Sequence, residues 1–202
     1  MNTLLETSYK KATQALNFFA REKDGKINKM KAIKLLYLAD RLHIRKYGRP
    51  IIWDEYWAMK LGPVGSRAKK VAELNVPAHF LSYAQKYIKP TDGKKRAFIS
   101  LKPVDTDIFS KTDVECLEKV NSVFGDRDQF ELAELTHQYP EWKKYAKELG
   151  TGKKRVAMNN EDFFAEANEA NKDNMIFAQK KSDLDLARDS FRESEETAAI
   201  FA

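Results

Sequence analysis

Residues 31–64 read KAIKLLYLADRLHIRKYGRPIIWDEYWAMKLGPV, and this stretch decides the fold. Its first half, up to about Lys46, predicts a helix, and Asn28 is placed to cap its N-terminus. Apolar residues occupy more than one side of that helix, which is typical of a central, buried element. Gly48 and Pro50 then end it, because glycine tolerates positive φ and proline disfavours a helical residue before it.

The second half of the stretch alternates in the manner of a strand over residues 51–60. Trp53 and Trp57 fall on one face, and Tyr56 falls on the other. Gly62 and Pro63 follow, and we expect them to form a turn that leads into a third helix over residues 67–74, capped by Ser66. This segment lacks the length and the Gly-Lys-Ser/Thr ending of a phosphate-binding loop.

Two polar residues stand out within the central helix. Asp40 and His43 are three positions apart, so they share a face and are close enough to touch. They form either an acid–base or recognition pair, or a hydrogen-bonded pair that fixes the end of the helix. Buried polar side chains are generally hydrogen-bonded, which favours the second interpretation.

Outward from this stretch, residues 7–22 predict a first helix, with Thr7 or Ser8 as its cap. Residues 83–90 and 96–102 flank an Asp-Gly pair, which is typical of a β-hairpin. We expect that hairpin to form a three-stranded sheet with residues 53–59.

Further helices are expected over residues 113–124, with Ser110 or Thr112 as the cap, from Asp128, and from Pro140 to about Leu149. The glycines and basic residues of 150–155 have the composition of a linker. The predicted fold is therefore mainly α with a small antiparallel β-sheet (α+β). We expect a compact helical domain over residues 1–149 and a helical C-terminal extension over residues 150–202.

The extension contains few large apolar residues. We expect helices at roughly 160–170 and 182–199, and a less regular segment at 172–180. From Ser182 onward six acidic residues outnumber two basic ones, a net charge of −4. Because its anchors are too sparse for a core of their own, the extension either packs on the body or contacts a partner. The main anchors are Phe163, Phe164, Phe177 and Phe191.

Composition excludes several classes of protein. Hydrophobic residues make up 43% of the 202-residue chain, which is enough for a packed core. The single cysteine, Cys116, excludes an internal disulfide and favours the reducing cytoplasm. There is no apolar run long enough to span a membrane and no secretory signal at the N-terminus.

The net charge of +6 raises the question of nucleic-acid binding. The positive residues are spread along the chain, which favours a solvated basic surface. Binding to nucleic acid is therefore a less favoured alternative that is not excluded. The residues that would carry it are Lys69, Lys70, Lys94, Lys95 and Arg96.

The sequence provides no positive case for catalysis. His43, His79 and His137 lie far apart and lack the spacing of metal ligands, so no metal or cofactor is expected. Cys116 falls on the apolar side of its helix, as a structural thiol does. Asp54 and Glu55 are adjacent in a predicted strand, so they point to opposite faces and cannot act as a carboxylate pair.

Several linked motifs resemble the Panacea, or SocA-like, antitoxin domain. They are KLLYLAD at 34–40, YGRP at 47–50 and YWAMKLGPV at 56–64, followed by ELTH at 134–137 and PEW at 140–142. The resemblance covers roughly residues 8–149. Its order and spacing are more specific than any single motif, and the extension lies beyond it.

This resemblance implies a bacterial or phage antitoxin that neutralises a protein toxin, encoded by a neighbouring gene, by direct binding. Relatives often carry an added N-terminal helix-turn-helix module, which we do not expect here, and at least one relative delivers its toxin to a Clp-type protease. A proteolytic adaptor, with residues 198–202 as a weak degron, and a regulator of its own operon remain alternatives. A homo-oligomer is left open.

We expect Trp53, Tyr56, Trp57, Phe163, Phe164, Phe177 and Phe191 to contact the partner, and Asp40, His43, Gly48, Pro50, Gly62 and Pro63 to form the framework.

Overall fold

A computed structural model describes residues 3–91, 93, 96–166 and 172–200. It confirms a mainly α-helical fold with small antiparallel sheets. The α-helices are α1 (Thr3–Arg21), α2 (Lys29–Tyr47), α3 (Ser66–Ala72), α4 (Ala78–Tyr87), α5 (Lys111–Phe124), α6 (Gln129–His137), α7 (Pro140–Gly150) and α8 (Lys181–Ile200). The strands are β1 (Lys26–Asn28), β2 (Tyr56–Met59), β3 (Gly62–Gly65), β4 (Ile88–Pro90), β5 (Ala97–Ser100) and β6 (Arg155–Ala157). Short 3₁₀ helices span η1 (Thr106–Ile108), η2 (Asn160–Phe164) and η3 (Lys172–Phe177).

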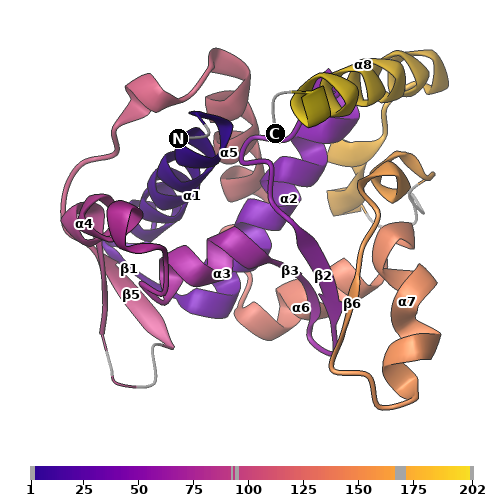
Figure 1. Cartoon of the computed structure of the whole chain (residues 1–202). Coiled ribbons are helices and arrows are strands. Elements are labelled where there is room, and N and C mark those ends of the chain that lie inside the picture. The colour runs from indigo at the N-terminus through magenta and orange to yellow at the C-terminus, as the bar shows by residue number, and fades with distance from the viewer. Residues whose placement is uncertain (1–2, 92, 94–95, 167–171, 201–202) are drawn as a thin grey trace.

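Helix α2 is the centre of the fold, as its apolar pattern predicts (Figure 1). The side chain of Asn28 accepts hydrogen bonds from the backbone N–H groups of Met30 and Lys31 and so caps the helix. Gly48 ends it in the left-handed conformation, at φ 65°. Helices α1, α5, α6 and α8 all pack against α2, so even its polar residues from Asp40 to Arg45 are buried.

The strands form two sheets rather than the single sheet that the sequence predicts. One has the order β1-β5-β4 and the other has the order β3-β2-β6. The predicted hairpin between β4 and β5 is present, but the strand expected over residues 83–90 begins only at Ile88, because residues 78–87 form helix α4. Strand β2 pairs instead with its neighbour β3 and with the distant β6.

The aromatic strand is shorter than predicted, and the glycine-proline turn is itself a strand. Trp53 has a φ of 50°, which is incompatible with an extended strand, and β2 begins only at Tyr56. Pro63 lies in β3 opposite Ala58, and the turn is at Lys60 and Leu61. Proline is tolerated there because β3 is an edge strand.

Two predicted helix caps are also wrong. Helix α1 begins at Thr3, so Thr7 and Ser8 lie inside it, and the Ser8 hydroxyl donates to the carbonyl of Leu4. Ser66 is the first residue of α3 rather than its cap. The free backbone N–H groups at the start of α3 are instead bonded by a residue outside the helix. The Asp54 carboxylate accepts hydrogen bonds from the backbone N–H groups of Arg67 and Ala68.

The C-terminal extension is part of the packed core. Residues 155–157 form β6, which pairs with β2 and holds the end of the predicted linker against the body. Of the segment expected to be helical at 160–170, residues 160–164 form the 3₁₀ helix η2, which ends at the extended Ala165, and residues 167–171 lie outside the described residues. The final helix, expected at 182–199, is present as α8.

Candidate functional site

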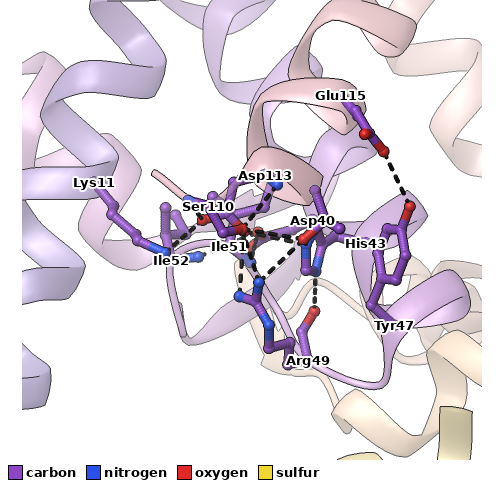
Figure 2. Close-up of polar contacts among 11 residues, drawn as sticks. Lys11, Asp40, His43, Tyr47, Arg49, Ile51, Ile52, Ser110, Asp113 and Glu115 are labelled. Carbon is purple, nitrogen blue, oxygen red and sulfur yellow. Dashed lines mark hydrogen bonds and ion pairs between the residues drawn. The ribbon is translucent and has the colours of Figure 1, made fainter. Parts of the chain in front are cut away.

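Asp40 lies at the centre of a buried network at the C-terminal half of α2 (Figure 2). Its Oδ1 accepts from the backbone N–H groups of Ile51 at 2.6 Å and Ile52 at 3.3 Å, and its Oδ2 accepts from the Tyr56 hydroxyl at 2.7 Å. Burial raises the pKa of Asp40 to about 7, although these donors favour the charged form. Asp40 therefore fixes the chain that follows the Gly48–Pro50 break.

His43 bonds to a different set of partners, so the predicted contact with Asp40 is not the one it makes. Its Nδ1 donates to the carbonyl of Arg49 at 2.6 Å, and its Nε2 lies 2.9 Å from Thr112 Oγ1 and 3.1 Å from Asp113 Oδ1. Figure 2 shows how these contacts join α2 to α5 through the helix break. His43 is thus a link between two helices, and the predicted hydrogen bond within the Asp40–His43 pair is wrong.

The buried carboxylate of Asp113 contacts two positively charged side chains. Lys11 lies 2.6 Å from its Oδ2, and Arg49 lies 3.2 Å from its Oδ1. Burial alone would raise the pKa of Asp113, but hydrogen bonds from His43, Lys11 and the backbone of Ser110 outweigh it and hold the pKa well below its ordinary value. Asp113 also completes a capping box with Ser110. It therefore joins α1, the helix break and α5.

This network has the residue types of a catalytic site but not the arrangement. A nucleophile, base and orienting acid act in series, with the base using one ring nitrogen for each neighbour. Here the same His43 nitrogen faces both Thr112 and Asp113, and the other donates to a backbone carbonyl. The side chains of His43 and Asp113 are both fully buried, which leaves no access for a substrate. The arrangement supports a structural role.

A second buried network connects α2 to the start of α7. Arg41 Nε lies 2.6 Å from Glu141 Oε1, and the Tyr37 hydroxyl donates to the same oxygen at 2.5 Å. The Arg41 guanidinium lies 4.1 Å from the ring centroid of Tyr139 and 4.4 Å from that of Phe177. Both charged side chains are fully buried. A buried pair of this kind is costly to break, so it specifies how α7 and the extension pack on α2.

Arg45 attaches the extension to α2. Its guanidinium donates to the backbone carbonyls of Phe163 and Ala165, each at 2.7 Å, and to that of Phe177 at 3.1 Å. Burial, together with the positive charge of Arg41, lowers the pKa of Arg45 to about 9. One charged group therefore satisfies carbonyls from both η2 and η3.

Gly48 permits the last helix to approach the break. A Cβ atom at Gly48 would lie 2.4 Å from the carbonyl oxygen of Ala187 and 2.8 Å from Ser190 Cβ, both on α8. The residue therefore meets two demands at once, the positive φ of the helix end and close contact with α8. Gly62 is similarly confined, because a Cβ there would lie 2.4 Å from Thr136 Oγ1 and 2.7 Å from Lys34 Nζ.

The structure places most of the aromatic residues expected at a partner interface inside the molecule. Tyr56 and the four phenylalanines of the extension are buried. Their rings pack on one another and on the body: Phe163 on Tyr37 and Tyr56, Phe164 on Phe191, Phe177 on Phe124 and Tyr139, and Phe191 on Trp53. Trp53 and Trp57 are half-buried, and the Arg155 guanidinium lies 4.2 Å from the Trp57 ring centroid. The four phenylalanines are therefore covered by the molecule itself, whereas part of each tryptophan is exposed.

The remaining candidate groups do not form a reactive site. Cys116 is buried, and burial raises the pKa of its thiol to about 12. Within the described ranges, no three His, Cys, Asp or Glu residues gather to hold a metal ion. Lys69, Lys70 and Arg96 are exposed, but Lys94 and Lys95 lie outside the described residues. None of the helices, as far as the chain is described, combines the length and apolarity needed to cross a membrane.

Sequence reasoning missed four residues that hold the framework together: Arg41, Arg45, Asp113 and Glu141. Asp113 had a detectable signal, because a serine followed three residues later by an acid is typical of a capping box. Glu141 stands in the PEW motif, but its partner is 100 residues away. Nothing in the sequence marks Arg41 and Arg45 as buried, because arginine side chains are usually exposed.

Comparison with known proteins identifies one family. The model described as "Antitoxin SocA-like, Panacea domain" matches residues 33–143. That range begins within α2 and ends within α7, so it includes Asp40, the β2–β3 hairpin and the Arg41–Glu141 pair. No curated protein matches the chain. No solved structure matches it either.

Proposed function

Because the chain belongs to the SocA-like antitoxin family that carries the Panacea domain, we propose that it neutralises a protein toxin by direct binding. The family match over residues 33–143 is the observation that carries this proposal. The toxin would be the product of a neighbouring gene. The complex would form in the cytoplasm.

The polar groups of the framework support binding rather than chemistry. Asp40, Asp113 and Glu141 are buried and saturated by donors from the backbone, from arginines or from lysine. A catalytic carboxylate needs access to a substrate, and these three have none. The proposed activity is therefore the steric or conformational inhibition of a toxin, without a covalent step.

The C-terminal extension would form part of the same binding body. Its four phenylalanines and the hydrogen bonds from Arg45 of α2 hold it on the body, so the described residues of the extension help to shape the surface that a partner meets. The exposed, acidic outer face of α8 and the edges of Trp53 and Trp57 would remain available for contact. The extension would then contact the partner through its exposed residues, while its four phenylalanines remain buried in the core.

Co-expression tests this function. The neighbouring gene would be induced in a host cell with and without this protein, and growth would be followed together with co-purification of the two products. We expect growth arrest from the neighbour alone, rescue by this protein and a stable complex. A harmless neighbour, or rescue without a complex, would contradict the proposal.

The alternatives predict different outcomes in the same cells. An operon regulator would lower transcription of the toxin gene from its own promoter but would not rescue growth when the toxin is made from a foreign promoter. A proteolytic adaptor would rescue growth only when the Clp protease is present, and toxin levels would fall. Direct binding predicts rescue in protease-deficient cells with toxin levels unchanged.

A further inference from the structure

A pocket of about 370 Å³ opens beside the β2–β3 hairpin. It is bounded by the first turns of α2, by the turn between the two strands, by α3 and by the segment just before β6. Its volume is at the lower end of the usual range for ligand sites, roughly 300–1,000 Å³, so it suits a few side chains rather than a whole helix. The lining residues are Lys29, Met30, Ile33, Lys34, Met59, Lys60, Leu61, Val64, Lys69 and Lys154.

The pocket combines an apolar interior with a positive rim. Its apolar lining comes from two methionines and three aliphatic residues, and Leu61 keeps 48% of its surface exposed. Lys60, Lys69 and Lys154 are exposed at the rim, while Lys29 pairs with Glu73 at 2.6 Å. None of the ten lining residues is acidic. A complementary ligand therefore needs apolar side chains and negative charge together.

Lys34 adds a positive group in the wall of the pocket. It is almost fully buried, and its Nζ donates to the carbonyl of Pro63 at 2.6 Å. Among the described residues, no carboxylate lies within ion-pair distance of it. Burial lowers the pKa of Lys34 to about 7, which expresses the cost of holding an unpaired charge there. A negative group in the pocket would offset that cost.

We propose that this pocket binds an acidic segment of the partner protein, with one or two apolar side chains entering between the lysines. The proposal rests on the proposed function, because the partner is the toxin. Nucleic acid is a poorer occupant, because a phosphate backbone satisfies the lysines but offers no aliphatic side chain for Met30, Val64 and Leu61. The toxin contact would then lie between α2 and the β2–β3 hairpin.

The first test uses the full chain and a defined probe, a fluorescein-labelled peptide in which Glu and Leu alternate. Two control peptides replace every Glu by Gln or every Leu by Ser. We expect saturable binding of the Glu/Leu peptide and at least about tenfold weaker binding of both controls. Equal binding of the Gln peptide, no binding of the Glu/Leu peptide, or its displacement by a DNA duplex would overturn the proposal.

Matched variants place the probe in the pocket. K60E/K69E reverses two rim charges, and K119E/K143E makes the same change in net charge at exposed positions outside the pocket. L61S and L101S remove leucines that are 48% and 45% exposed, and only Leu61 lines the pocket. We expect K60E/K69E and L61S each to weaken peptide binding at least about fivefold, with both controls within twofold of the original protein. Equal effects of the pocket variants and their controls would overturn the site.

The same variants are then assayed against the toxin. If the original protein neutralises the neighbouring gene product and K60E/K69E does not, the pocket is the toxin contact. If both neutralise it equally, the pocket proposal fails and the proposed function stands. If the original protein does not neutralise it, the proposed function fails, and with it the assignment of the occupant to the toxin; the peptide measurements then decide separately whether the pocket takes acidic, apolar ligands.

Discussion

The Nε atom of Arg41 lies 2.6 Å from Oε1 of Glu141, with both side chains fully buried and the two residues 100 positions apart in the chain. This pair fixes α7 against the central helix. The aromatic rings of Tyr139, just before α7, and Phe177, in the extension, both pack on the guanidinium. The middle of α2, the PEW motif and the extension therefore meet at one charged group.

The first prediction concerns this ion pair. R41M leaves the Glu141 carboxylate buried without its arginine, and E141L leaves Arg41 without its carboxylate, so each single substitution should cost about 3–5 kcal/mol of unfolding free energy. The double variant R41M/E141L removes both charges and should cost clearly less than the sum of the two. Urea denaturation of the four proteins measures this coupling. Additive costs would show that the two side chains do not stabilise each other.

The second prediction concerns the attachment of the extension. F177A removes a fully buried ring that packs on Phe124 and Tyr139, and we expect a loss of about 3–5 kcal/mol. L186A lies in the same extension but changes a side chain that is 70% exposed, so it should stay within about 0.5 kcal/mol. Thermal and urea denaturation compare the two. Similar small effects of both would mean that the extension detaches in solution.

The third prediction separates backbone strain from helix packing at Gly48. Gly25 and Gly48 both have positive φ, at 83° and 65°, but only Gly48 has another helix within contact distance. G25A should therefore cost about 1 kcal/mol from strain alone. G48A should cost more, because its Cβ would strike the backbone of α8 at Ala187. If the two unfolding free energies change equally, α8 does not pack on the helix break.

The fourth prediction concerns the pH dependence that Asp40 introduces. Its folded pKa of about 7 is above its ordinary value of 3.8, so the folded state binds more protons between these values. The contribution of Asp40 to stability is therefore fully present below pH 3.8 and is lost as the pH rises to 7, by up to about 1.4 kcal/mol per pH unit. D40N cannot titrate, yet its amide oxygen can still accept from Ile51 and its amide nitrogen can donate to the Tyr56 oxygen.

Urea denaturation of both proteins from pH 5 to pH 8 measures this contribution, since all other titrating groups are common to the pair. We expect the original protein to lose stability relative to D40N as the pH rises. A difference that stays constant across this range would contradict the assignment of the raised pKa to Asp40.

The sequence predicts well those features that depend on neighbouring residues. Asn28, Ser110 and Asp128 cap their helices through backbone groups two or three positions away, and Gly48 ends α2 through its own φ. The β4–β5 hairpin likewise follows from a local Asp-Gly pair. Each of these signals lies within a few residues of its effect, so pattern and propensity are sufficient.

The remaining features depend on contacts between distant parts of the chain. Residues 62–65 have the composition of a turn, yet they form an edge strand because β2 is available beside them. Strand β6 has no strong pattern of its own and pairs because the chain after α7 passes β2. The pattern of phenylalanines in the extension indicates that they are buried. It does not indicate whether they are buried against this molecule or against a partner. The pocket arises from four separated segments, so no single motif marks it.

Inhibition of the purified toxin by this purified protein, with no protease or DNA present, tests the central claim most directly. The activity of the neighbouring gene product would be titrated with increasing amounts of the full chain, and the complex would be weighed by light scattering. Direct binding predicts that activity falls to background at a fixed molar ratio and that a complex of that composition forms. Full toxin activity in the presence of excess protein would contradict it.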